Sequence, residues 1–431
     1  MPESTVAPAS PAAARAIAGA ADGPSLAAEA AGFLDDLAAW RHELHQMPEL
    51  SNDLPRTSAF VQERLRELGV PFRTAVGGSC VIALIGRGAE AAAAGDGTAT
   101  DEQAGPTVLL RADMDALPVA EESGEPFAAA NGRMHACGHD MHATALLGAA
   151  RLLKEREGEV RALGGTVKLV FQPGEETFQG ARAALADGLL ESPHVDAAYA
   201  MHVIGAMPLG VIGHGLQALS GVYGFRVTLT GKGGHGSSPE VCVDPITAGV
   251  HVHLALQELI AREVSAMKEV ALTIGRFAGG EAANVIPDTC VLEGTMRVFD
   301  PELMRALVAR IGKLVRGVAA TYRVGAEIEV LNNVPPLVLD PGMVEACAGY
   351  VGAALPDAKQ VGGMHNMASE DFALVAERVP SAYFMVGAAV PDAAEHYAQH
   401  NPKIRFADEE LPMGAAAYAA VALGWLADHA A

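Results

Sequence analysis

The amino-acid sequence predicts an α/β protein with a mainly parallel sheet, interrupted by an inserted ferredoxin-like α+β domain. The first observation is that apolar strands alternate with helices from Val108 onward, which is typical of a parallel sheet covered on both faces. The second is a change of order near Gly221, where the pattern becomes βαββαβ, the order of the ferredoxin-like unit. The third is that helices and strands resume after this unit, so the chain is expected to rejoin its first sheet.

Each element of the first sheet follows from a local pattern. An amphipathic helix is expected over residues 33–50 and a strong helix over 141–155. The expected strands are apolar runs that end in acidic residues or a histidine, and they cover 107–115, 166–176 and 195–203. The last helix, Ala415–Ala427, is apolar but too short to span a bilayer. Residues 88–106 are low in complexity and predict a solvent-exposed loop.

The inserted domain is expected to contain four strands and two helices. The strands cover 223–231, 270–277, 290–299 and 326–333, and the helices cover Asp244–Val264 and Pro301–Tyr322.

Composition limits the partners and the compartment. The 431 residues carry a net charge of −22, which argues against nucleic acid or an anionic membrane as a partner. Residues 1–30 lack the basic start and sustained apolar core of a secretory signal, and they predict a flexible Ala/Pro-rich tail. The five cysteines are odd in number and scattered, which favours a reduced, cytoplasmic protein over a disulfide framework.

Side chains able to bind a metal follow several of the predicted strands. Asp113 and Asp115 close one strand, the Glu175–Glu176 pair closes another, and His202 closes a third. In open α/β sheets, ligands bind beyond the carboxyl ends of the strands. The sequence therefore predicts that these side chains lie at one site.

The segment His-Ala-Cys-Gly-His-Asp-Met-His (135–142) has three interpretations: a metal site, an activated thiol, or a polar helix start without chemistry. Cys137 alone would be typical of a buried apolar residue, and His202 alone of a core histidine. Sulfur, imidazole and carboxylate together favour a borderline ion such as zinc. Neighbouring side chains at a strand end diverge, so one of the two glutamates can bind metal while the other transfers protons.

Ten stretches resemble the metallo-aminoacylase and carboxypeptidase family, in its amidohydrolase branch. Hippurate hydrolases and plant hydrolases of indoleacetyl–amino-acid conjugates belong to this branch. The stretches run in order from about residue 40 to 415, and they are WRHELHQMPEL, RADMDALP, HACGHDMH, FQPGEE, AMHV with PLG, GKGGHGSSPE, GGEAANVIPD, EGTMRVF, SEDF and HNPKIRFADEELP.

The resemblance implies two divalent ions per chain, zinc or manganese, with cobalt and nickel as further candidates. The implied ligands, with the thiolate shared between the ions, are Cys137, His139, Glu176, His202 and His400. Glu175 would be the general base and acid. Arg111 stands where the wider superfamily usually has a metal-binding histidine, so Asp113 is expected to orient a ligand histidine instead. The roles of His135, Asp140 and His142 stay open, with a helix cap as one reading of Asp140.

Three residues of the inserted domain are further candidates. GKGGHG fits the spacing of a dinucleotide-binding loop, but Ser-Ser-Pro follows where a helix should begin, which excludes that reading. By resemblance, His235 in this segment stabilises the oxyanion from the neighbouring subunit of a homodimer or a dimer of dimers. Asn284 is expected to contact the substrate. Arg297 is a candidate for the substrate carboxylate, and a plain surface charge is its alternative.

The sequence therefore predicts a metal-dependent hydrolase that splits N-acyl amino acids into a carboxylic acid and an amino acid. Its metal-binding catalytic domain would comprise 31–219 and 334–431, and the inserted lid and dimerisation domain 220–333. The alternatives are a dipeptidase or carboxypeptidase with the same chemistry, a metal-binding protein without turnover, and a thiol enzyme with Cys137 as nucleophile.

Overall fold

The computed structural model describes residues 6–19, 25–94, 98–391 and 393–430. The chain forms two compact units: unit 1 is Met1–Ala218, Val338–His365 and Leu374–Ala431, and unit 2 is Leu219–Leu337 and Asn366–Ala373. The predicted boundaries assign Asn366–Ala373 to the catalytic domain, but this segment clusters with unit 2. There, the Ser220 hydroxyl donates a 2.8 Å hydrogen bond to the carbonyl of Met367.

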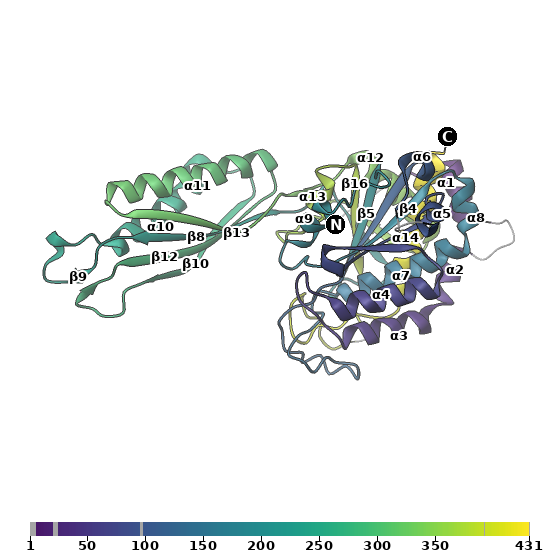
Figure 1. Ribbon diagram of the computed structural model, residues 1–431, viewed down its shortest axis with the longest axis horizontal. Coiled ribbons are helices and arrows are strands. Elements are labelled where there is room, and N and C mark those ends of the chain that lie inside the picture. Colours follow the sequence, from purple (N-terminus) through teal and green to yellow (C-terminus); the bar gives the residue numbers. More distant parts are fainter. Residues whose placement is uncertain (1–5, 20–24, 95–97, 392, 431) are drawn as a thin grey trace. The chain divides into compact units, whose positions relative to one another are not determined.

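Unit 1 is built on an eight-stranded sheet in the order β1-β2-β4-β3-β5-β16-β6-β15 (Figure 1). Its strands are β1 (Phe72–Ala75), β2 (Cys80–Gly86), β3 (Thr107–Asp113), β4 (Thr166–Gln172), β5 (Ala197–Ile204), β6 (Val211–His214), β15 (Lys359–Val361) and β16 (Ser381–Gly387). The central strands β4, β3, β5 and β16 are parallel, and antiparallel pairs lie toward both edges. The predicted mainly parallel sheet is confirmed.

Helices bury the central strands of this sheet. They include α3 (Leu34–His45), α4 (Pro55–Glu67), α7 (His139–Glu155), α9 (Gly180–Ala186), α12 (Pro341–Ala354) and α14 (Glu410–Asp428). α7 and α14 pack against each other and against β3 and β5. Every residue of β3 and β4 is buried, which explains why these strands read as continuous apolar runs.

α14 is longer than the predicted Ala415–Ala427. At 19 residues it is the one helix of the described residues long and apolar enough to cross a membrane. However, 89% of its most apolar window is buried inside the protein. Its apolar character is therefore that of a core helix in unit 1.

Unit 2 has the predicted βαββαβ order. Its strands β8 (Gly221–Thr230), β10 (Val270–Gly279), β12 (Thr289–Val298) and β13 (Gly325–Val334) pair antiparallel in the order β10-β12-β8-β13. Two helices, α10 (Pro245–Glu263) and α11 (Pro301–Thr321), pack against strand residues such as Phe225 and Leu292. Two short strands, β9 (Gly234–His235) and β11 (Val285–Ile286), form a separate ribbon.

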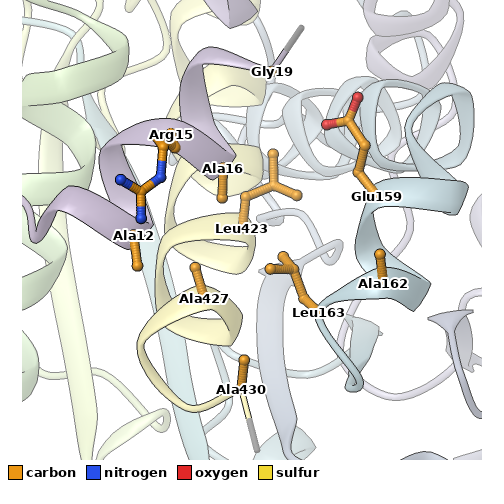
Figure 2. A pocket seen from close by; sticks show the side chains of 10 residues that line it. All are labelled: Ala12, Arg15, Ala16, Gly19, Glu159, Ala162, Leu163, Leu423, Ala427 and Ala430. Atoms are coloured by element: carbon orange, nitrogen blue, oxygen red, sulfur yellow. The ribbon is translucent and has the colours of Figure 1, made fainter.

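The N-terminal segment departs from the predicted flexible tail. Residues 1–5 and 20–24 lie outside the described residues, but two helices, α1 (Pro11–Ala18) and α2 (Leu26–Ala31), occupy much of the rest. Ser10 caps α1 by accepting a hydrogen bond from the amide of Ala13, and Ile17 is buried. α1, α8 (Glu157–Ala162) and α14 line a pocket of about 600 Å³, and half of its ten lining residues are alanines (Figure 2). Alanine has the highest helix propensity, so the Ala-rich composition that suggested a flexible tail is equally compatible with these two helices.

The segment 88–106 is also more ordered than predicted. Residues 95–97 lie outside the described residues, and the flanks form α5 (Ala89–Ala94) and α6 (Asp101–Ala104). Thr100 and Gln103 form a capping box at the start of α6. Ala89 and Ala104 are buried in a small cluster with Leu84 of β2. The described flanks therefore pack alanines against β2, while residues such as Glu90 and Glu102 stay exposed.

The first residue of α14, Glu410, is fully buried. Neither of its carboxyl oxygens has a hydrogen-bond partner among the described residues. Burial raises the pKa of this carboxyl to about 8, because an unpaired charge is costly in the core, and the charge of Arg41 lowers it only in part.

We expect Glu410 to make folding less stable as pH rises. Between its ordinary pKa of 4.5 and about 8, the folded state holds a proton that the unfolded state has lost. The free energy of unfolding should then fall by about 1.4 kcal/mol per pH unit from this group alone. Urea unfolding at about pH 5 and about pH 8 should show that Glu410→Gln removes this fall, whereas Glu409→Gln on the exposed side should not. Parallel pH profiles for wild type and Glu410→Gln would contradict the expectation.

Candidate metal centre and active site

Six predicted site residues meet at the carboxyl end of the parallel strands of unit 1. Glu175 and Glu176 follow β4, and His202 lies near the end of β5. Cys137 and His139 lie at the start of α7, and His400 lies on the segment between β16 and α14. Three overlapping groups have ligand atoms within 4.8 Å of one another: Cys137–His139–His202, Cys137–Glu176–His400 and His139–Glu175–Glu176.

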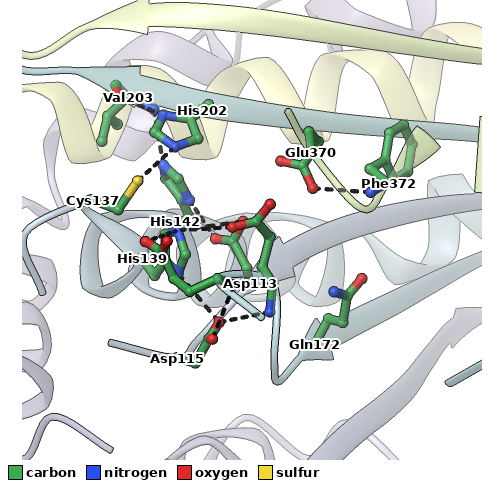
Figure 3. A network of polar contacts seen from close by, with 12 residues as sticks. Asp113, Asp115, Cys137, His139, His142, Gln172, His202, Val203, Glu370 and Phe372 are labelled. Atoms are coloured by element: carbon green, nitrogen blue, oxygen red, sulfur yellow. Dashed lines mark hydrogen bonds and ion pairs between the residues drawn. The ribbon is translucent and has the colours of Figure 1, made fainter. Parts of the chain in front are cut away.

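Cys137 lies at the centre of the cluster. Its Sγ is 3.3 Å from Nε2 of His202, and Figure 3 shows the thiol pointing at that ring. Nε2 of His400 is 3.4 Å from Oε1 of Glu176. Nε2 of His139 is 3.9 Å from the same oxygen and 4.0 Å from Oε2 of Glu175. The spacing leaves room for cations between these groups.

Hydrogen bonds to the far side of the rings determine which histidines can bind a metal. Nδ1 of His202 donates to the carbonyl of Val203 at 2.6 Å, so its Nε2 presents a lone pair toward Cys137. Both nitrogens of His142 are occupied, because Nε2 accepts the amide of Val203 at 2.9 Å and Nδ1 bonds to Asp113. His142 therefore supports the end of the strand that carries His202. It has no free nitrogen lone pair with which to bind an ion.

Asp113 differs from the sequence expectation in its partner. The histidine that it orients is His142, which is not one of the predicted ligands. Its other oxygen accepts from Arg111 Nη1 at 2.6 Å. Burial raises the pKa of Asp113, but Arg111, His139 and His142 outweigh burial and hold that pKa well below its usual value. Asp113 is therefore a permanent anion beneath the cluster.

Asp115 has a role that the sequence analysis did not assign. Its Oδ1 accepts the backbone amide of Glu175 at 3.0 Å, and its Oδ2 accepts that of Glu176 at 3.2 Å. Oδ1 also lies 3.5 Å from Nδ1 of His139. One carboxylate thus fixes the turn that carries both glutamates. The available signal was its place two residues after Asp113, at the end of the same strand.

The carboxylates dominate the electrostatics of the cluster. Burial lowers the pKa of His139, but Asp113, Asp115 and Glu176 raise it to about 10. Burial raises the pKa of the Cys137 thiol well above its usual value, and nearby carboxylates raise it further. A free thiolate nucleophile is disfavoured here, which argues against the thiol-enzyme alternative. The same negative field favours a bound cation.

His400 is held in an unusual backbone conformation. Its φ is 69°, a left-handed value that is rare for residues other than glycine. Its backbone amide donates to the carbonyl of Ala136 at 2.8 Å, next to Cys137. Its side chain is 52% exposed, unlike the buried Cys137 and His139.

The donor atoms present in the cluster fit a transition-metal site. Both ring nitrogens of His139 and Oε1 of Glu176 are buried without a hydrogen-bond partner among the described residues. Such groups are costly to leave unpaired in a protein interior. Sulfur, imidazole and carboxylate donors within reach of one another suit zinc and similar ions.

The three predicted residues of unit 2 do not lie together. His235 pairs with Val285, so it is beside Asn284, whose carbonyl accepts the amide of Gly236 at 2.8 Å. Arg297 lies opposite Val222, at the other end of β8, and donates to the hydroxyl of Ser369. The length of β8, at ~3.3 Å per residue, separates the two ends of the sheet by roughly 25 Å.

The family is decided by a match that covers most of the chain. Residues 109–424 match the family model described as "Peptidase family M20/M25/M40". The chain belongs to this peptidase family. The family resemblance predicted from the sequence is thereby confirmed.

Curated relatives are similar over most of their length. An N-acetyl-L-cysteine deacetylase of Bacillus subtilis (strain 168) is 36% identical over 351 residues, covering 80% of this chain and 79% of the relative. The "IAA-amino acid hydrolase ILR1-like 2" of Arabidopsis thaliana is 34% identical over 397 residues, covering 90% of this chain and 85% of the relative. These relatives place the chain in the amidohydrolase branch.

Solved structures share the fold. An aminohydrolase from methicillin-resistant Staphylococcus aureus has a TM-score of 0.84 and 32% identity, over 93% of this chain and 99% of that chain. The Bacillus subtilis YXEP protein, described as a dinuclear metal-binding peptidase, has a TM-score of 0.74 and 30% identity, over 92% and 99%. The chain is accordingly a hydrolase of amide bonds, and its clusters of candidate ligands belong to a family with dinuclear members.

Proposed function

We propose that the protein is a metal-dependent amidohydrolase that cleaves the amide bond of N-acyl amino acids, giving a carboxylic acid and a free amino acid. One observation carries the proposal: Cys137, His139, Glu175, Glu176, His202 and His400 converge at one sheet edge in a chain of this family. The substrate class follows from the relatives, which are named for acetylated cysteine and for conjugates of an amino acid.

The ligands proposed for two divalent ions are Cys137, His139, Glu176, His202 and His400, with the thiolate shared. The thiolate, imidazole and carboxylate donors favour zinc. Manganese, cobalt and nickel are the further candidates that come with the family resemblance. When bound, such ions supply Lewis-acid polarisation of the carbonyl and lower the pKa of a coordinated water.

Glu175 is proposed as the group that moves the proton. It is buried beside His139, and Asp115 accepts a hydrogen bond from its backbone amide, so the backbone that carries this carboxylate is held in place. Glu175 takes a proton from the attacking water as the C–O bond forms. It returns that proton to the amide nitrogen as the C–N bond breaks, and the amino acid leaves as a neutral amine.

His235 and Arg297 are proposed to act on the substrate from different chains. The two ends of the sheet in unit 2 are much further apart than the carbonyl and carboxylate of one N-acyl amino acid. Arg297 would bind the carboxylate within its own chain, whereas His235, with Asn284 beside it, would reach the oxyanion of a second copy. A homodimer is therefore proposed as the minimal active form. Five free, buried cysteines suit a cytoplasmic setting.

We expect the metal-reconstituted protein to hydrolyse N-acetyl, N-benzoyl or longer N-acyl amino acids. The free carboxylate should matter, since Arg297 is proposed to bind it, and the matching amides should be poor substrates. Product amino acid can be measured by amine derivatisation, with free dipeptides as the comparison set. Turnover of dipeptides alone would favour the dipeptidase alternative, and chelator-resistant turnover would exclude the metal proposal.

We expect the two glutamates to differ when each is changed to glutamine. Glu175→Gln should keep both ions, because it is not a ligand, and should lower kcat by about 100- to 10,000-fold. Glu176→Gln should instead lower the bound metal per chain. Elemental analysis beside kcat separates the two effects, and the opposite pattern would show that their roles are exchanged.

We expect two inactive variants to restore activity when they are combined. Glu175→Gln and His235→Ala would be mixed in equal amounts, dissociated and reassembled. In a mixed dimer, one site combines an intact Glu175 with an intact His235 from the other chain, so roughly a quarter of wild-type sites should return. Mixed dimers verified by mass that recover no activity would show that His235 acts within its own chain.

A further inference from the structure

Arg41 on α3 is a buried cation that no step of the proposed chemistry uses. Its side chain is 2% exposed, and its bonds reach two distant parts of the chain. Nε donates to Oδ2 of Asp140 at 3.0 Å, and Nη1 donates to the carbonyl of Phe406 at 3.0 Å. Nη1 also pairs with Oδ1 of Asp408. One guanidinium therefore joins segments more than 260 residues apart in the sequence.

Both segments carry proposed metal ligands. Asp140 directly follows His139 in the first turn of α7, and Phe406 and Asp408 end the segment that contains His400. The two segments also touch directly, because a Cβ added at Gly138 would lie 3.1 Å from Cζ of Phe406. Arg41 thus connects the backbone that presents Cys137 and His139 to the backbone that presents His400.

The segment that carries His400 needs such support. The left-handed φ of His400 is strained for a residue with a side chain, and that side chain is half exposed. A ligand on a mobile, strained segment must be ordered when the ion binds, which weakens binding. A ligand already held in place avoids that loss.

Asp140 is itself held from a second side. Nδ1 of His45, one turn along α3 from Arg41, lies 2.9 Å from the same Oδ2, and Nε2 of His45 lies 3.1 Å from Glu121. Two side chains of α3, Arg41 and His45, therefore hold the carboxylate of Asp140 in position. A buried pair of this kind often adds little net stability, so stability alone does not explain its position beside a ligand loop.

We propose that Arg41 is a positioning residue that preorganises the metal centre, by holding the His400 segment against the Cys137–His139 loop. The inference rests on the proposed ligand set. It predicts that loss of Arg41 weakens chiefly the ion bound with His400, and that the ion bound by Cys137, His139 and His202 is affected less.

The test measures metal affinity without substrate. Apo protein would be titrated with Co²⁺ or Zn²⁺ against a competing chelator to give a dissociation constant for each ion. The thermal midpoint of each apo variant would be measured as well, so that a loss of metal affinity can be told from a loss of stability. Arg41→Lys keeps the charge but loses the planar fork that bonds both segments. The ion bound with His400 should bind about 10- to 100-fold less tightly, approaching the behaviour of His400→Ala.

Two further variants separate positioning from general stability. Asp408→Asn removes the charge that both Arg41 and His42 of α3 contact on the His400 segment, and it leaves the bond from Arg41 to the carbonyl of Phe406 in place. The Asp408 side chain is 26% exposed, so the variant should fold and show a smaller loss at the same ion. Arg151→Ala is the matched control: it removes another ion pair between α7 and α3, with Asp36 at 2.8 Å, far from the ligand loop. The control should bind both ions as wild type does.

The outcomes are distinguishable. If wild type binds no ions, the proposed metal centre itself fails. If wild type binds two and both Arg41→Lys and Asp408→Asn match its dissociation constants, the inference about Arg41 is overturned. It is also overturned if both ions weaken equally in step with the thermal midpoint, or if Arg151→Ala shows the same loss. If Arg41→Lys does not fold, Asp408→Asn decides alone.

Discussion

The site depends on one constraint, which is that several carboxylates are buried together at the end of a parallel sheet. Asp113 and Asp115 are fully enclosed and Glu175 nearly so, and Glu176 adjoins them. Like charges in a poorly hydrated space repel strongly, so the arrangement requires compensating positive charge or donors. Arg111 compensates Asp113, and the amides of the two glutamates compensate Asp115. The imidazoles and the thiol of Cys137 complete the cluster. The negative charge of its carboxylates that is not compensated within the protein favours binding of cations.

The sequence was sufficient for the main architecture and for the set of ligand-type residues. β3 and β4 are buried on both faces, so they appear as apolar runs, and the polar residues that end them are visible by contrast. The contributions of Asp115 and His142 were not visible, because they depend on backbone amides that only the folded turns leave available. Arg41 was equally hidden, since its partners lie about 100 and 365 residues away.

Alanine-rich segments were the other failure of sequence reasoning. Alanine has little side chain, so an Ala-rich composition does not tell a packed helix from a linker, yet α1 and α5 both bury residues against their neighbours. Whether such a segment packs is decided by the surface that it meets. For α1 that surface is α14, and for α5 it is β2. The composition of a segment therefore does not show whether the segment packs, because packing also depends on the surface it contacts.

The insertion of unit 2 has a consequence for the order in which the protein is built. β5 and β16 are parallel neighbours, but the whole of Leu219–Leu337 lies between them in the chain. During synthesis, unit 2 can fold on the ribosome while the sheet of unit 1 still lacks β16 and α14. Folding of unit 2 brings its own two ends together, because Val222 of β8 pairs with Val334 of β13, so little loop-closure entropy remains to be lost when β16 joins β5. The segment that carries His400 is made after β16, so the cluster can be completed only in a nearly finished molecule. Until then, its acidic edge stays exposed to any cation that the cell supplies.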